Sequence, residues 1–185
     1  KPPPLASAEY VRHTFDNYAP RFESHLVEEL QYQSPEILLE CFLKEHHATK
    51  PSALDILDLG CGTGLCGALM KPYAKYLAGV DLSENMIDEA RRKEIYDKLT
   101  IADISEHLDN ENRLFDVILA ADVFIYIGDL REIFRKIFTR LRSGGMFIFS
   151  TEKPEKNCAD YALLASGRYA QSLDYIKSLC KSSGL

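Results

Sequence analysis

Short apolar segments and longer amphipathic segments alternate along the chain from about residue 54 onward. Five apolar segments predict strands, at residues 55–59, 76–80, 99–102, 115–121 and 146–149. Apolar residues that recur at helical spacing predict helices at residues 65–71, 83–93, 130–142 and 173–181. Strands that alternate with helices are typical of an α/β fold with a doubly wound, mostly parallel sheet.

The first 50 residues have a helical pattern instead. Ser34-Pro35-Glu36 is a typical helix start, with a capping serine, a proline in the first turn and then an acid. We expect residues 1–50 to form an N-terminal helical cap on a main unit at residues 51–185, all within one structural domain. Residues 152–172 are expected to be a long loop or lid with weak helical content.

The net charge of the chain limits the kinds of binding partner that we expect. Among the 185 residues, 22 Lys and Arg stand against 28 Asp and Glu, which gives a formal net charge of −6. This acidic balance argues against a nucleic-acid clamp, which needs a basic face to neutralise phosphates. No apolar run approaches the ~20 residues that cross a membrane. We therefore expect a small-molecule partner, and the sequence leaves the oligomeric state open.

The cysteines bear on the compartment and on metals. Five cysteines are an odd number in a chain that is long enough to fold without disulfides. We expect them to be reduced and the protein to be cytoplasmic. No second Cys or His pair lies at zinc spacing, so we expect no metal site.

A glycine-rich turn, Gly60-Cys61-Gly62-Thr63-Gly64, joins the first strand to its helix. Such a turn lets a ligand approach the backbone and the N–H groups of the helix start. Residues 62–67 also match the dinucleotide pattern G-x-G-x-x-G, so a nicotinamide oxidoreductase is one interpretation.

Three acids favour another ligand. Asp58, Asp81 and Asp103 each lie where a strand ends, and parallel strands bring these ends to one edge of the sheet. Asp81 suits the two hydroxyls of a ribose, and Asp103 can accept from an exocyclic amine such as adenine N6. Asp58, beside the turn, would repel a pyrophosphate and attract an ammonium group. The predicted ligand is an adenosine with a positively charged tail and no phosphates.

These residues carry a family resemblance. The segments 58–64, Gly79-Val80-Asp81-Leu82-Ser83, Ala102-Asp103, 115–122 and 141–145 resemble, in this order, class I S-adenosylmethionine-dependent methyltransferases. The resemblance covers roughly residues 10–184. Two flanks, residues 15–22 and 166–173, are similar to a subgroup of small-molecule methyltransferases that are sometimes fused to tetratricopeptide repeats.

The resemblance implies S-adenosylmethionine as cofactor and S-adenosylhomocysteine as product. It places Asp58 on the methionine ammonium, directly or through water, and Asp81 on the ribose. The other cofactor-binding positions that it implies are Tyr18, Gly60, Cys61, Gly62, Thr63, Gly64, Leu82, Met86, Ala102, Asp103, Ile104 and Ala120. In that family the sheet ends in an antiparallel hairpin after the last helix. Because this chain stops just past its last expected helix, we expect that hairpin to be missing.

The expected reaction is in-line methyl transfer to a small acceptor. Asp122 and Tyr126 are candidates for a base, while Arg168 and Tyr169 in the late loop are candidate substrate contacts. Arg168 in an acidic protein favours a carboxylated acceptor. Two alternatives stay open, an NAD-type oxidoreductase and a protein that binds S-adenosylmethionine without catalysis.

Overall fold

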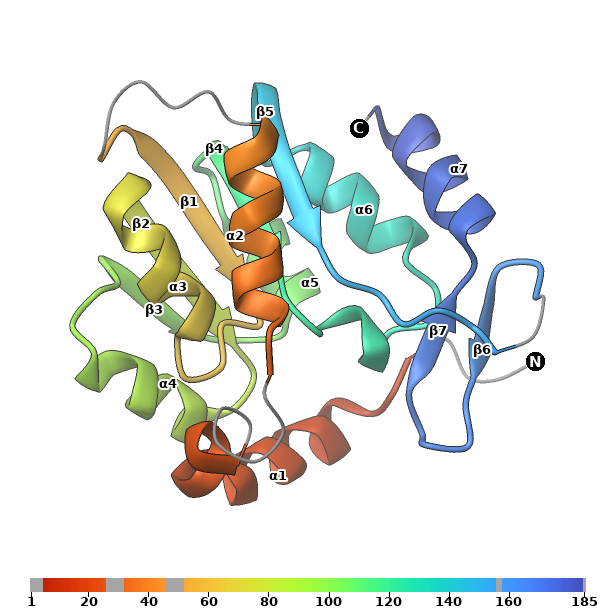
Figure 1. Ribbon diagram of the computed structural model, residues 1–185, viewed down its shortest axis with the longest axis horizontal. Helices are drawn as coiled ribbons and strands as arrows, with labels where there is room; N and C mark the ends of the chain where they lie inside the picture. Colours follow the sequence, from red (N-terminus) through yellow and green to blue (C-terminus); the bar gives the residue numbers. More distant parts are fainter. Residues whose placement is uncertain (1–4, 26–31, 46–51, 156–157, 185) are drawn as a thin grey trace.

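The computed structural model describes residues 5–25, 32–45, 52–155 and 158–184. Its centre is a five-stranded sheet in the order β3-β2-β1-β4-β5, and every pair of neighbouring strands is parallel (Figure 1). The strands are β1 Leu54–Leu59, β2 Ala74–Asp81, β3 Lys98–Ile101, β4 Phe115–Ala120 and β5 Leu141–Phe149. The α/β fold and the five predicted strands are confirmed, although β5 begins at Leu141 and not at the predicted residue 146.

Helices cover both faces of the sheet. They are α2 Ser34–Glu45, α3 Leu65–Met70, α4 Glu84–Arg92, α5 Ile104–Asn110, α6 Arg131–Phe138 and α7 Leu173–Ser183. Helix α1 Ala8–Tyr18 lies instead near the carboxyl ends of the strands, and a 3-10 helix, η4, spans Phe124–Tyr126. Side chains alternate across β1 because successive strand residues point to opposite faces. Ile56 packs with Phe42 of α2 and Met70 of α3, whereas Leu57 packs with side chains of α5, α6 and α7.

Hydroxyl and carboxylate side chains start several of these helices. Ser7, Ser83 and Ser172 cap α1, α4 and α7, and each accepts a hydrogen bond from a backbone N–H in the first turn. The boundary expected at residues 50 and 51 lies outside the described residues. The division into a cap and a main unit therefore stays a prediction.

The late part of the chain differs from the expectation. Residues 152–172 contain a small antiparallel hairpin, β6 Tyr161–Leu163 and β7 Tyr169–Gln171, which forms its own sheet before α7. The five-stranded sheet itself ends at β5. Three-residue strands are too short for a reliable alternation of apolar and polar residues, so the sequence pattern did not reveal them.

Two further boundaries were wrong or missed. Helix α6 ends at Phe138, not at residue 142, because Leu141 already pairs with Phe115 in the sheet. The pairing is irregular between there and Met146, which pairs with Val117, so residues 142–145 lie opposite Asp116 alone. Helix α5 had not been predicted. Its seven residues are mostly polar, and Asp103 caps it by accepting from the N–H groups of Ser105 and Glu106.

None of the helices in the described ranges combines the length and the apolar character that a membrane crossing requires.

Candidate functional site

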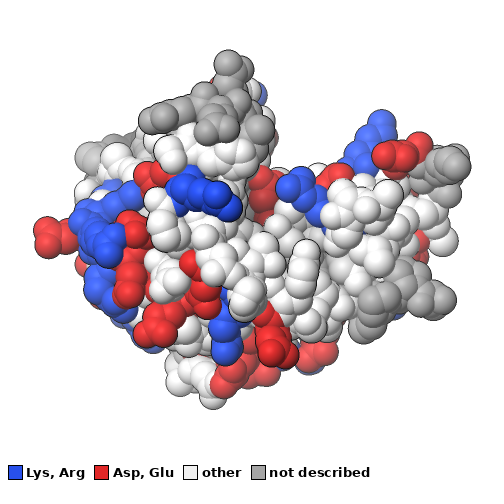
Figure 2. Space-filling view, turned by 90° about the horizontal axis from the view of Figure 1, so that it is seen from below, with Lys and Arg blue, Asp and Glu red and all other residues white. Residues whose placement is uncertain are grey.

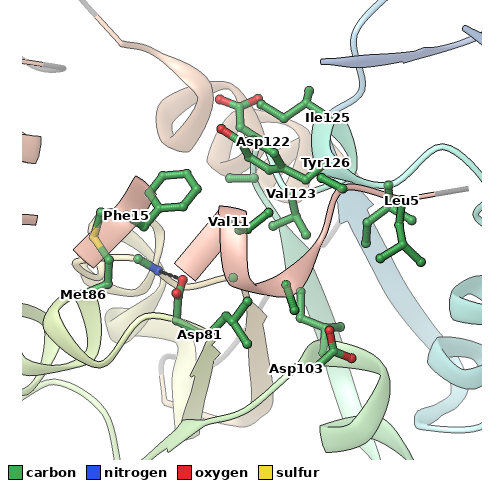
Figure 3. Close-up of a pocket in the computed structure, with 18 of the residues that line it drawn as sticks. Leu5, Val11, Phe15, Asp81, Met86, Asp103, Asp122, Val123, Ile125 and Tyr126 are labelled. Atoms are coloured by element: carbon green, nitrogen blue, oxygen red, sulfur yellow. Dashed lines mark hydrogen bonds between the residues drawn. The ribbon is translucent and has the colours of Figure 1, made fainter. Parts of the chain in front are cut away.

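A cavity of about 470 Å³ lies at the carboxyl ends of the strands, beneath α1 (Figure 3). Ligands of open α/β sheets bind at this edge. Met86 and Asp81 lie on one side of the cavity, and Leu5 and Ile125 on the other. Of the expected site residues, the cavity lining includes Tyr18, Gly60, Gly62, Asp81, Leu82, Met86, Asp103, Ile104, Asp122, Tyr126 and Arg168.

The glycine turn has the backbone that only glycine adopts easily. Gly60, Gly62 and Gly64 have φ angles of 64°, 52° and 90°. A Cβ added to Gly60 would lie 2.4 Å from Cγ2 of Val123, so this glycine permits a close approach. A Cβ added to Gly62 would meet no atom within 4 Å, so the face of Gly62 is open to a ligand.

Asp81 is a carboxylate in the cavity lining whose orientation is fixed by backbone hydrogen bonds. Its Oδ2 accepts from the N–H of Gly62 at 2.9 Å, and its Oδ1 accepts from the N–H of Ser83 at 2.9 Å. Burial raises the pKa of Asp81, and these backbone donors oppose that rise. A carboxylate offers about four acceptor positions, so Asp81 can still accept from a ligand.

Asp103 has two structural roles. It caps α5 and it lines the cavity with Ile104. Ala102 instead packs against the core and is not among the described lining residues, and the same holds for Ala120. Ala121, one residue further along, lines the cavity in place of Ala120.

Asp58 lies below the turn and is 1% exposed. It faces a second cavity of about 50 Å³, whose lining includes Cys61 and Thr63 and shares Gly60 and Gly62 with the larger one. The hydroxyl of Tyr96 donates a hydrogen bond of 2.7 Å to Oδ2 of Asp58. Burial raises the pKa of Asp58 to about 7.

Asp122, just after β4, has a left-handed backbone with φ 54°. Its carboxylate accepts from the hydroxyls of Ser34 at 2.9 Å and Ser150 at 2.7 Å, and Tyr32 lies within hydrogen-bond reach. These contacts connect the start of α2 and the end of β5 to the cavity. A left-handed backbone is unfavourable for a residue other than glycine, so it needs such supporting contacts. Strained conformations of this kind are common at functional sites.

The segment with α1 passes over the cavity. At its start Leu5 forms a bridge with Ile127, and the N–H of Ala6 donates to the carbonyl of Tyr126 at 3.0 Å. At its end the Ser83 hydroxyl donates to Asp16 at 2.5 Å. The ring of Phe15 packs edge-on against Tyr126, with 5.5 Å between centroids, and Tyr18 is hydrogen-bonded to His25.

The two expected substrate contacts have different environments. Arg168 lines the cavity, its side chain is 55% exposed, and it lies 3.9 Å from the carboxylate of Glu152. Tyr169 is 1% exposed, packs against Tyr161, and is absent from the lining of either described cavity. Tyr169 begins the buried strand β7, whereas Arg168 lies in the turn before it.

The site contains residues that sequence reasoning had not assigned. Tyr96 contacts Asp58, Ser150 contacts Asp122, and Asp16 contacts Ser83, over separations of 38, 28 and 67 residues. Asp16 falls within the flank that carried the narrower resemblance, but that pattern alone indicated no partner. Contacts over such separations follow from strand order and have no local signal.

The charge of the lining is mostly negative. Within the described lining of the larger cavity, Arg168 is the only Lys or Arg, against five acids, namely Asp81, Asp103, Asp122, Asp129 and Glu132. Figure 2 shows charges of both signs interspersed on the face it presents, with no single basic patch. The residues that the structure describes include no group of three or more His, Cys, Asp or Glu side chains that could hold a metal ion.

Comparison with known proteins identifies relatives. A family model described as a methyltransferase domain matches residues 57–149, just over half of the chain. Human methyltransferase-like protein 27 is 34% identical over 109 residues, which cover 58% of this chain and 44% of that protein. A malonyl-[acyl-carrier protein] O-methyltransferase of Bacillus cereus is 30% identical over 116 residues, with coverage of 59% and 41%. The chain therefore spans less than half the length of these two relatives.

A solved structure shares the fold. The magnesium protoporphyrin IX methyltransferase of Synechocystis, crystallised with bound S-adenosylhomocysteine, superimposes with a TM-score of 0.73 at 16% identity, covering 96% of this chain and 88% of that one. The family match begins at Leu57, just before the glycine turn, and ends with β5, so it includes the strand ends that form the cavity. The chain belongs to the class I S-adenosylmethionine-dependent methyltransferases.

Proposed function

We propose that this protein binds S-adenosylmethionine in the cavity beneath α1 and transfers its methyl group to a small-molecule acceptor. The observation that carries the proposal is Asp81, whose carboxylate is fixed by two backbone donors beside the open face of Gly62. This arrangement suits a ribose diol, because a carboxylate can accept from both hydroxyls.

The lining residues fit the rest of the cofactor. Leu82, Met86 and Ile104 supply apolar surface for an adenine, and Asp103 supplies an acceptor for its amine. At the other end, the small cavity at Asp58 suits an ammonium group. Tyr18 in the larger cavity, with Cys61 and Thr63 in the small one, would complete the enclosure, whereas Gly64 lines neither described cavity and lies against Tyr96.

The cofactor would supply a methyl group on a positively charged sulfur, which is already activated for displacement. The protein then needs no nucleophile, and its residues hold the acceptor in line and exclude water. The α1 segment covers the cavity and supplies Val11, Phe15 and Tyr18 to its lining. Asp122 and Tyr126 are the lining groups that we propose for a proton that must leave the acceptor.

The acceptor that the lining favours is a small, mostly apolar molecule with a carboxylate. Leu5 and Ile125 supply apolar surface on the side of the cavity away from Met86 (Figure 3), and Ile127, which forms a bridge with Leu5, adds to the lining. Arg168 is a cation in the same lining. An arginine fork binds a carboxylate through two parallel hydrogen bonds. The Bacillus cereus relative is by its name an O-methyltransferase. We propose no atom of the acceptor as the site of methylation.

An oxidoreductase with a nicotinamide dinucleotide is the competing interpretation. A pyrophosphate at the turn would lie beside Asp58 and Asp81, and the described lining offers one cation against five acids. Anions at a helix start are favoured when the surroundings are neutral or positive, and these carboxylates remove that advantage.

Calorimetric titration with S-adenosylhomocysteine and with NAD tests the proposal. We expect S-adenosylhomocysteine to bind and NAD not to bind. Asp81→Ala should weaken binding of S-adenosylhomocysteine by about 2 kcal/mol, because two charge-assisted hydrogen bonds are lost. Asp88→Ala, on the exposed side of α4, is the control and should bind as the wild type does. Binding of NAD alone would refute the proposal.

Turnover of labelled S-adenosylmethionine with a panel of small carboxylated and uncarboxylated acceptors tests catalysis. With a carboxylated acceptor, Arg168→Ala should raise KM by about tenfold or more, since a charge-assisted pair is lost. Arg135→Ala, on the exposed face of α6, should leave KM unchanged. Equal KM values for wild type and Arg168→Ala would end the carboxylate assignment. Binding without turnover of any acceptor would favour the non-catalytic alternative.

A further inference from the structure

Tyr96 connects the segment before β3 to the last residues of β1, which are distant in the sequence. It lies between α4 and β3, and its hydroxyl donates to Oδ2 of Asp58, which ends β1, at 2.7 Å. The neighbouring residue, Asp97, fixes the segment to β2, because the N–H of Leu77 donates to its carboxylate at 2.8 Å and the N–H of Asp97 donates to the carbonyl of Leu77 at 2.8 Å. These two hydrogen bonds fix the backbone next to Tyr96, and this limits where the Tyr96 side chain can reach.

Three glycines make room for the ring of Tyr96. A Cβ on Gly67 would lie 2.1 Å from its hydroxyl oxygen, one on Gly79 would lie 2.9 Å from Cε1, and one on Gly64 would lie 3.0 Å from Cε2. Real Cβ atoms essentially never make contacts as short as those at Gly67 and Gly79, and the contact at Gly64 is tighter than most. The glycines of α3, β2 and the turn thus form a slot that this ring occupies, and the slot directs the hydroxyl at Asp58.

The surroundings of Asp58 contain donors and acids. The groups that face it are the Tyr96 hydroxyl, the backbone of Gly67, Asp81, Cys61 and Cys66. None of these groups carries a positive charge. An ionised Asp58 therefore depends on hydrogen bonds, of which that from Tyr96 is the one from a side chain.

The cavity in front of Asp58 is small. Its volume of about 50 Å³ is enough for one ammonium group or one water molecule. It shares Phe22, Tyr32 and Ala121 with the larger cavity, so the two cavities are adjacent. Tyr96 lies behind Asp58 and is absent from the described lining of both cavities.

We propose that Tyr96 is a positioning residue, whose hydroxyl orients the Asp58 carboxylate toward this small cavity so that it receives the ammonium group of the cofactor's methionine end. This inference rests on the proposed function. The hydrogen bond favours the charged form of Asp58, whereas burial and Asp81 oppose it.

Binding of a ligand with an ammonium group should depend on pH. The pKa of Asp58 is about 7, so at lower pH the carboxyl is neutral and attracts an ammonium group less. Loss of the Tyr96 hydroxyl removes a donor to the charged form and raises this pKa further. A ligand with the ammonium group should therefore bind better above pH 7 than below it, and the variant without the hydroxyl should need a higher pH.

Calorimetry with two ligands separates this role from a structural one. S-Adenosylhomocysteine has the ammonium group, whereas 5′-methylthioadenosine has the same nucleoside and sulfur without it. The proteins are the wild type, Tyr96→Phe, Asp58→Asn and the control Tyr73→Phe, a partly buried tyrosine that packs on Phe42. Each is titrated with both ligands between pH 6 and pH 8.5.

At pH 7 we expect Tyr96→Phe to bind S-adenosylhomocysteine about tenfold more weakly, since a hydrogen bond to a charged group is lost. The loss should shrink at pH 8.5, and binding of 5′-methylthioadenosine should change by less than about twofold. Asp58→Asn should weaken S-adenosylhomocysteine and abolish the pH dependence. Tyr73→Phe should match the wild type with both ligands.

Equal losses for both ligands, or no loss for either, would overturn the role of Tyr96. Should Tyr96→Phe fail to fold, the wild type still decides, because its preference for S-adenosylhomocysteine over 5′-methylthioadenosine must fall below pH 7. A constant preference would overturn the inference. Failure of the wild type to bind either ligand would instead refute the proposed function itself.

Discussion

Asp58 and Asp81 show how two acids at equivalent strand ends acquire different properties. Both follow apolar strands, and burial raises the pKa of both. Asp81 faces the large cavity and accepts from two backbone N–H groups, whereas Asp58 faces the small one and accepts from Tyr96. The environment, and not the residue type, therefore makes the two acids different, which is why we propose a ribose diol for Asp81 and an ammonium group for Asp58.

The raised pKa of Asp58 predicts a pH-dependent stability. Its pKa is about 7 in the folded protein against an ordinary value of 3.8, so between these values the folded state binds more protons than the unfolded state. Stability without ligand should then fall as pH rises from about 4 to about 7. Asp58→Asn has no such carboxyl and avoids this loss. Its free energy of unfolding relative to that of the wild type should therefore be a few kcal/mol higher at pH 8 than at pH 5.

Urea unfolding at the two pH values measures this difference. Asp88→Asn, at an exposed position on α4, is the matched control and should show no comparable gain. If the difference between Asp58→Asn and the wild type is the same at pH 5 and pH 8, Asp58 does not titrate in this range.

At the scale of elements, α1 differs from the helices that cover the sheet. No residue within Ala8–Tyr18 is buried, although several line the cavity. The segment is attached at its ends, by Leu5 and Ala6 to η4 and the residue after it, and by Asp16 to the start of α4. An element with few buried apolar contacts opens at lower cost than the core does. Helix α1 is thus suited to admit and enclose a ligand.

Asp16 is the contact to test at this scale. Asp16→Ala removes the acceptor for the Ser83 hydroxyl, and Ser83 in turn donates its N–H to Asp81. We expect S-adenosylhomocysteine to dissociate roughly tenfold faster, in line with the loss of one charge-assisted hydrogen bond, as measured by stopped-flow fluorescence or surface plasmon resonance. Glu9→Ala, exposed on the same helix, should dissociate at the wild-type rate. An unchanged rate in Asp16→Ala would show that this contact does not hold α1 closed.

At the scale of the whole molecule, the strand order brings the site together. The order β3-β2-β1-β4-β5 places the ends of β1, β2 and β4 side by side. Strands β2 and β3 are added on one side of β1 and strands β4 and β5 on the other, so the direction of strand addition reverses between β1 and β4. Ligands of open α/β sheets bind at such a reversal. The cavity lies there, and the hairpin β6–β7 adds Arg168 from the opposite end of the chain.

Much of this arrangement was predictable from the sequence. The apolar segments predicted the five strands, and Ser34 and Ser83 predicted two helix starts. Acids at three strand ends and a glycine turn predicted one ligand edge. Each of these signals is local, since it depends on residues within one or two turns or one strand, and parallel strands then bring their ends to the same edge without further information.

Other features depended on tertiary structure alone. The hydrogen bonds of Tyr96 to Asp58, Asp16 to Ser83 and Ser150 to Asp122 join residues at least 28 positions apart. Tyr169 is buried in the β6–β7 pairing, whereas Arg168, in the turn just before β7, lines the cavity. The sequence by itself thus determined the elements and the chemistry at their ends. Packing decided which side chains meet, because contacts between distant segments arise only once the sheet has formed.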